Sequence, residues 1–197
     1  MDLLLKKPTI QLRLPTDLHL SDEQLFELCQ LNQELRIERT VLGELLIMSP
    51  ASSDSGARNA SLTGQLWLWN RTTSLGQVFD SSAGFVFANG AMRAPDAAWI
   101  RRERWEALPL SQRQKFAPIS PDFVVELKSP SDKLEDLQSK MQEYIENGVL
   151  LGWLIDPMQR RVWIYKPGIE SLTLENSLSL SDPLLPGFEL ELEEIFA

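Results

Sequence analysis

Apolar and polar residues alternate over several short segments of the chain, and this pattern predicts many short β-strands. Residues 36–39 and 44–48 flank Leu42-Gly43 and predict a hairpin. Residues 122–128 form the strongest strand pattern, because apolar residues fill most of the segment. Further short strands are predicted at residues 77–80, 85–88, 92–100, 150–155 and 161–166.

Helical signals fall between these strands. Ser21 and Gln24 have the spacing of a capping box and predict an N-terminal helix over about residues 21–31. A loop at residues 50–54 leads to a second helix over 57–72, and residues 102–115 predict a polar helical connection. A helix beginning at Ser131-Asp132 should end near Asn147-Gly148, and a short helix should close the chain. Strands mixed with helices predict an α/β fold, a mixed central β-sheet flanked by helices.

Length and composition fit one domain spanning residues 1–197, with an acidic C-terminal segment at 170–197. Hydrophobic residues make up 43% and charged residues 24% of the chain, which is typical of a soluble globular protein. The sequence contains neither a signal-peptide pattern nor an apolar run of about 18 residues, the length that a membrane helix needs. We therefore expect a cytoplasmic protein without a membrane partner.

Scarce cysteine and histidine restrict the chemistry. Cys29 is the one cysteine, which excludes an intramolecular disulfide and a cysteine-rich zinc site. His19 is the one histidine and precedes the first predicted helix, which argues against Ser-His-Asp catalysis and histidine-rich zinc sites. The catalytic chemistry that remains possible uses carboxylates and lysine together with a hard metal ion.

Net charge is −9, which is unfavourable for a protein that binds nucleic acid. Seven of the 28 acidic residues lie between Glu170 and Ala197, and no basic residue accompanies them, so 21 acids face 19 bases in the rest. Binding a phosphate backbone needs a local basic cluster rather than a positive total. One candidate, which could equally be a solvated helix face, consists of Arg101, Arg102, Arg104, Arg113 and Lys115.

The strand at residues 122–128 carries the first candidate site. Alternation sends Phe123, Val125 and Leu127 to one face, so Glu126 and Lys128 project together from the other. Their Cα atoms would lie roughly 7 Å apart, close enough for both side chains to reach one water. A simple ion pair between Glu126 and Lys128 explains the same pattern.

Asp96 offers a second carboxylate within an otherwise apolar strand. Aspartate is disfavoured in strands, so its presence requires a reason. Pro95 could set a turn at the start of the strand. Alternatively, Asp96, Glu126 and the backbone carbonyl of Leu127 could hold Mg²⁺, which binds one or two carboxylates while keeping several waters.

These segments resemble a known family. Pro95-Asp96, followed thirty residues later by Glu126-Leu127-Lys128, is similar to the PD-(D/E)xK nuclease superfamily. More narrowly, the chain resembles the Uma family of restriction-endonuclease-like proteins, which is expanded in cyanobacteria. The similar segments lie at residues 43–50, 94–96, 121–130, 140–149 and 153–157.

The resemblance implies a restriction-endonuclease-like core in which Asp96 and Glu126 bind Mg²⁺, with Mn²⁺ as a substitute, and Lys128 activates the attacking water. Glu44 matches an early acid of the family that could complete the metal shell, although it could also be a charged hairpin residue. Lys140 and Tyr144 match a helix position that often faces the site and are candidates for substrate contact. They are four residues apart and share one helix face, so a surface lysine over a packed tyrosine is the other interpretation.

The expected activity is metal-dependent phosphodiester hydrolysis in nucleic acid, with DNA favoured and RNA left open. Two alternatives are a catalytically inactive nuclease-fold protein that binds nucleic acid or a protein, and a scaffold that acts through its acidic surface. Cutting both strands of a duplex requires two sites, so a homodimer is also an expectation.

Overall fold

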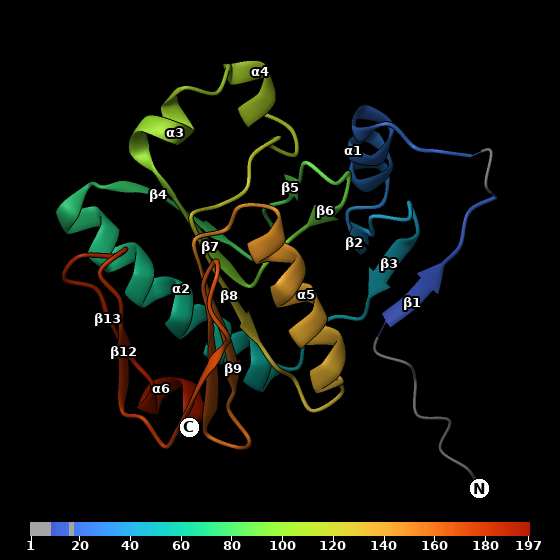
Figure 1. Cartoon of the computed structure of the whole chain (residues 1–197). Coiled ribbons are helices and arrows are strands. Elements are labelled where there is room, and N and C mark those ends of the chain that lie inside the picture. The colour runs from blue at the N-terminus through green and yellow to red at the C-terminus, as the bar shows by residue number, and fades with distance from the viewer. Residues whose placement is uncertain (1–8, 16–17) are drawn as a thin grey trace, which may run out of the picture.

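The computed structural model describes residues 9–15 and 18–197 of the chain (Figure 1). Two larger sheets and one small hairpin contain its strands. An antiparallel five-stranded sheet has the order β1-β3-β2-β6-β5. Its strands are β1 (Thr9–Leu12), β2 (Arg36–Arg39), β3 (Leu45–Met48), β5 (Phe85–Val86) and β6 (Met92–Arg93).

The central six-stranded sheet has the order β11-β10-β9-β8-β7-β4. Its β8 and β9 are parallel and its other pairs antiparallel, so the sheet is mixed as predicted. The strands are β4 (Gly76–Asp80), β7 (Ala97–Arg101), β8 (Phe123–Leu127), β9 (Leu151–Asp156), β10 (Arg161–Tyr165) and β11 (Leu172–Glu175). Strands β12 (Ser179–Ser181) and β13 (Glu189–Glu191) form the hairpin.

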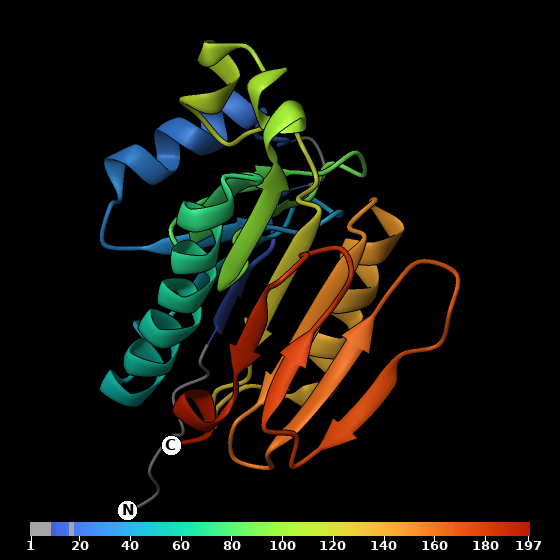
Figure 2. The same cartoon turned by 90° about the vertical axis from the view of Figure 1, so that its left-hand side faces the viewer.

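Helices cover both faces of the central sheet (Figure 1). Helix α5 (Leu134–Glu146) makes the crossover between β8 and β9, since parallel neighbours cannot be joined by a tight turn. It buries Met141 and Tyr144 on one face, while α2 (Ser53–Thr73) buries Leu62 and Leu66 on the other. Helix α6 (Glu193–Phe196) lies beside α2 (Figure 2).

The N-terminal helix agrees with its predicted cap. In α1 (Asp22–Leu31), the Ser21 hydroxyl accepts a hydrogen bond from the Gln24 amide, and the Gln24 side chain accepts one from the Ser21 amide. Helix α2 begins earlier than predicted, because Ser52 caps it and residues 53–54 are already helical. The connection at 102–115 divides into α3 (Arg102–Glu106) and α4 (Leu110–Arg113), with Pro109 at the N-cap of α4.

The predicted strand at residues 92–100 is wrong in one instructive respect. It divides into β6 and β7, which belong to different sheets. Residues 94–96 make the passage between them. Proline has no amide hydrogen for a strand ladder, and aspartate is a poor strand residue, so Pro95-Asp96 interrupts the pairing. Asp96 consequently lies where the two sheets meet.

Among the described residues, no helix combines the length and apolar character needed to cross a membrane.

Candidate active site

Asp96 and Glu126 come together through the register of β7 and β8. Ala97 pairs with Val125 in this antiparallel ladder, so the next residues to face each other are Asp96 and Glu126. The Leu127 amide donates a hydrogen bond of 2.8 Å to Asp96 Oδ2. The two carboxylates selected from the sequence therefore lie side by side. Asp96 also directly precedes β7, at a bend in the chain, and contacts β8 from there.

The Glu126 carboxylate is buried and held by α5. Lys140 Nζ lies 2.8 Å from Glu126 Oε1, and the Tyr144 hydroxyl donates to the same oxygen over 2.7 Å. Burial raises the pKa of Glu126 to about 7, with smaller upward contributions from Asp96 and Glu38, while Lys140 opposes the rise. Lys140 and Tyr144 thus face the site, as the resemblance implied, rather than the surface.

Glu38 on β2 is a third acid in this cluster, and the sequence did not single it out. Its Oε1 lies 3.0 Å from Lys140 Nζ and accepts a hydrogen bond of 3.1 Å from the Ala94 amide. Its Oε2 lies 3.1 Å from Arg93 Nη1. Burial alone would raise the pKa of Glu38, but Lys140 and Arg93 outweigh burial and hold this pKa below its ordinary value. Lys140 therefore bridges two glutamates, Glu38 and Glu126.

The cluster extends from Arg93 to a further acid of α5, Glu143, one helical turn after Lys140. Arg93 Nη2 lies 2.6 Å from Glu143 Oε2, and Asn89 donates a hydrogen bond of 3.2 Å to Glu143 Oε1. Burial lowers the pKa of Lys140, but the adjacent Glu126 and Glu38 carboxylates reverse this effect and keep the ammonium charged. Acids and bases alternate along this part of the cluster, so its buried charges compensate one another.

Asp96 lies at the more open end. Its Oδ1 accepts a hydrogen bond of 3.2 Å from Asn59 of α2, and Arg36 Nη1 of β2 lies 3.6 Å from the same oxygen. Arg36 Nη2 donates to the Ala94 carbonyl over 2.7 Å. Asp96 is thus oriented by one backbone amide and one side-chain amide, with a guanidinium next to it.

Lys128 shares the face of Glu126 but has other partners. Its Nζ lies 3.5 Å from Asp156 Oδ2 and donates a 3.4 Å hydrogen bond to the Ser129 carbonyl. Asp156 is almost fully buried. It lies next to Lys128 because Leu127 pairs with Ile155 in the parallel ladder of β8 and β9. The alternative prediction, an ion pair between Glu126 and Lys128, is wrong. In the described part of the chain, the cation beside Glu126 is Lys140 and the acid beside Lys128 is Asp156.

Asp96 and Glu126 fit a divalent cation by the chemistry of their donors. Lys140 and Tyr144 both contact Oε1 of Glu126, and Oε2 receives no hydrogen bond from the described residues. In the described part of the chain, no group of three or more His, Cys, Asp or Glu side chains is arranged to hold a metal ion. Two carboxylates with water ligands suit Mg²⁺. The Leu127 carbonyl stays a predicted ligand, since the contact seen in the structure is made by its amide.

Glu44 lies outside this cluster, contrary to the prediction that it completes the site. It accepts a hydrogen bond of 2.6 Å from Gln11, and Arg13 Nε lies 3.3 Å from its Oε1. Glu44 lies opposite Thr40 at the end of the β2–β3 hairpin, whereas Glu38 pairs with Leu46 two register positions further along. The charged-hairpin interpretation of Glu44 is the one that holds.

The predicted basic cluster is likewise separated from the site. Arg101 ends β7, whereas Asp96 precedes the start of that strand, so they lie at opposite ends. Arg104 and Arg101 both contact the buried Asp122, and Lys115 lies 2.7 Å from Glu23. These pairings reduce the positive charge available to a nucleic acid there.

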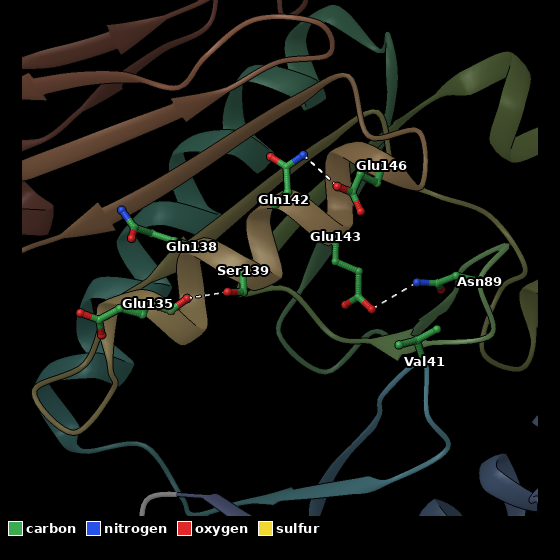
Figure 3. Close-up of a pocket in the computed structure, with 8 residues that line it drawn as sticks. All are labelled: Val41, Asn89, Glu135, Gln138, Ser139, Gln142, Glu143 and Glu146. Carbon is green, nitrogen blue, oxygen red and sulfur yellow. Dashed lines mark hydrogen bonds between the residues drawn. The ribbon is translucent and has the colours of Figure 1, made fainter.

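A surface hollow of about 730 Å³ lies along α5, on the side facing Val41 and Asn89 (Figure 3). Three glutamates, Glu135, Glu143 and Glu146, contribute to its wall, and no lysine or arginine does. Asp96, Glu126 and Lys128 do not line it either. The hollow is therefore acidic and separate from the carboxylate pair.

Comparison with known proteins agrees with this arrangement. Residues 22–193 match the sequence model of the Uma2 family, described as "Putative restriction endonuclease". The chain belongs to this family. The Uma2 resemblance inferred from its motifs is thereby confirmed.

Among solved structures, this Uma2 protein is similar to the crystal structure of "a putative nuclease belonging to DUF820" from Anabaena variabilis. The TM-score is 0.69 at 18% sequence identity, and the match covers 83% of this chain and 90% of the other. This likeness confirms the fold, a mixed α/β nuclease fold. A search of curated proteins finds no match.

Sequence reasoning missed six participants: Arg36, Glu38, Asn59, Arg93, Glu143 and Asp156. The sequence contained one signal for Arg36 and Glu38. Arg36 and Glu38 alternate within a four-residue strand and therefore share a face. A buried strand that places two charges on one face requires partners, although its sequence does not identify them.

Proposed function

We propose that this Uma2 protein is a metal-dependent nuclease that hydrolyses phosphodiester bonds, with DNA as substrate and Mg²⁺ as cofactor. The main support is the apposition of Asp96 and Glu126 across β7 and β8, fixed by the bond from the Leu127 amide to Asp96. Family membership supports the same class of reaction. A homodimer offering two sites to a duplex is a further part of the proposal.

Asp96 and Glu126 would hold the ion, each through a carboxylate that the protein already orients. Lys140 and Tyr144 hold Oε1 of Glu126, which leaves Oε2 as the oxygen to face the ion. When bound, Mg²⁺ polarises a phosphoryl oxygen and lowers the pKa of a bound water. Lys128, which follows Glu126 by two residues, would offset negative charge that develops on the phosphate. Asp156 and the Ser129 carbonyl orient its ammonium.

Calorimetric titration with Mn²⁺ tests the metal site without a known substrate. Wild type should bind, whereas Asp96→Asn and Glu126→Gln should not, because each loses an anionic ligand. Glu44→Gln is the matched control and should bind like wild type, since Glu44 contacts Gln11 and Arg13 instead. Equal binding by wild type and Glu126→Gln would rule out this metal site.

Cleavage assays then test the reaction on labelled duplex DNA, single-stranded DNA and RNA, with Mg²⁺ or with EDTA. We expect Mg²⁺-dependent cleavage of DNA that Asp96→Asn and Glu126→Gln reduce by at least about 100-fold, as loss of a major charge-stabilising group does. Cleavage that continues unchanged in EDTA contradicts the proposed mechanism.

A nuclease-fold protein that binds without cutting is the second candidate. The specific observation that favours it is charge compensation within the protein, because Lys140 contacts Glu126 and Arg36 contacts Asp96. Such a protein would bind nucleic acid but would neither bind Mn²⁺ at Glu126 nor cleave. The Mn²⁺ titration and the cleavage assay together separate the candidates.

A further inference from the structure

Arg36 differs from the other cations near the two carboxylates in its access to solvent. Its side chain is 35% exposed, compared with 10% for Arg93, 14% for Lys140 and 15% for Lys128. The three others are enclosed beside their acidic partners. Among these four cations, Arg36 is therefore the one that both lies next to Asp96 and is open to a large ligand.

Arg36 is also only partly engaged. A guanidinium has five N–H donors, and within residues 9–15 and 18–197 this one makes a single hydrogen bond, from Nη2 to the Ala94 carbonyl. Its contact with Asp96, at 3.6 Å, is longer than a hydrogen bond. Its Nε is buried without a hydrogen-bond partner among the described residues, which is uncommon for a buried donor. The guanidinium thus retains donors that a new acceptor could use.

Asp96 does not depend on Arg36 for its orientation. The Leu127 amide holds Oδ2 at 2.8 Å, and Asn59 holds Oδ1 at 3.2 Å. Arg36 can consequently turn from the carboxylate to a ligand while Asp96 keeps its place. An arginine side chain stays charged in proteins, so Arg36 offers a cation to a ligand.

The alternative approaches for a polyanion are less favourable. The hollow along α5 is lined by three glutamates. The predicted basic cluster begins at the opposite end of β7, where Arg101, Arg104 and Lys115 contact acids. Arg36 presents a planar donor group suited to two phosphate oxygens at once. We propose that Arg36 binds a backbone phosphate of the nucleic acid beside Asp96. This inference rests on the proposed nuclease function and deepens it.

Salt-dependent binding provides the test. Fluorescence anisotropy with a labelled mixed-sequence DNA duplex, and with the matching single strands of DNA and RNA, is measured in EDTA at several salt concentrations. At low salt, Arg36→Gln should bind these probes about tenfold more weakly than wild type does, as loss of a charged hydrogen bond predicts. The plot of log K against log salt should become shallower, its slope decreasing in magnitude by about one, the change expected for loss of one phosphate contact.

Two variants control for folding and for charge. Arg13→Gln removes another arginine that contacts a carboxylate, Glu44, and should leave affinity and slope unchanged. Arg36→Lys keeps the charge without the planar fork, so it should retain the slope and lose part of the affinity. An Arg36→Gln protein that melts like wild type yet binds more weakly supports the inference.

The outcomes distinguish this inference from the proposed function. Binding that depends on Arg36, in a protein that cleaves neither DNA nor RNA, supports the phosphate site and rejects the nuclease. Metal-dependent cleavage with equal slopes for wild type and Arg36→Gln retains the nuclease and overturns the role of Arg36. Wild type that binds none of the three probes also overturns it.

Discussion

Glu38 lies inside the ion cluster and Asp96 lies at its more open end, and their surroundings differ in kind. Glu38 is enclosed, with Lys140, Arg93 and the Ala94 amide occupying both of its oxygens. Asp96 is more exposed, and the cation beside it, Arg36, remains in contact with solvent. We call residues Glu38, Arg93, Glu126, Lys140 and Tyr144 the closed half, and residues Arg36, Asn59 and Asp96 the open half.

This difference separates stability from ligand binding. Buried charges must be compensated inside the protein, so removing one member of the closed half leaves another charge without a partner. Partly exposed charges are screened by water and contribute less to stability. The closed half should therefore support the folded state and orient Glu126, while the open half should receive the substrate.

Lys140→Met should produce the largest loss of stability. It would leave Glu38 and Glu126 without their shared cation in a buried environment, at a cost of about 3–5 kcal/mol in the free energy of unfolding. Urea unfolding measures this change. Lys133→Met, at the exposed N-cap of the same helix, should change the free energy by less than about 0.5 kcal/mol. Equal costs for the two variants would remove the distinction between the halves.

Glu126 should make stability depend on pH. Its pKa in the folded protein, about 7, lies above the ordinary glutamate value of 4.5, so the folded state retains a proton that the unfolded state has released. This contribution is complete below about pH 4.5 and is lost as the pH rises through 7. From pH 5 to pH 8, wild type should lose up to about 3 kcal/mol relative to Glu126→Gln.

The control for the pH experiment is Glu135→Gln, on the exposed side of α5, which should follow the pH dependence of wild type. Glu38 acts in the opposite direction, because its lowered pKa gives a contribution that is lost on acidification. A wild-type curve parallel to that of Glu126→Gln would mean that Glu126 titrates normally.

Tyr144→Phe should have a smaller effect. The change removes the hydroxyl that donates to Glu126 Oε1 and should reduce the free energy of unfolding by about 1–2 kcal/mol. Mn²⁺ affinity should fall several-fold because Glu126 loses part of its orientation. Tyr165→Phe, which removes a hydroxyl outside the closed half, should leave Mn²⁺ binding unaltered.

Glu44→Gln should have the smallest effect, below about 0.5 kcal/mol, because its partner Arg13 is 80% exposed. Glu38→Gln, on the same pair of strands, should destabilise the protein markedly by leaving Lys140 and Arg93 with one fewer anion. Thermal unfolding of both variants provides the comparison. Similar melting temperatures would show that burial of Glu38 carries no energetic weight.

The two glutamates also show where sequence reasoning stops. Both lie in the predicted hairpin at residues 36–48, and both follow the alternation of a strand. The family resemblance directed attention to Glu44, but the structure places Glu38 in the cluster, two register positions away on the facing strand. Alternation assigns a side chain to a face of a sheet but does not identify the element packed against that face.

The sequence by itself determined the mixed α/β fold, the capped first helix, and the shared face of Glu126 and Lys128, because these depend on local periodicity and nearby residues. It also identified Asp96, since an aspartate after proline is conspicuous in an apolar segment. Only the tertiary structure decided that residues 94–96 join two sheets, that Lys140 rather than Lys128 lies beside Glu126, and that β2 supplies Arg36 and Glu38. These contacts join residues from 14 to 102 positions apart, and their formation depends on packing between elements that no local pattern specifies.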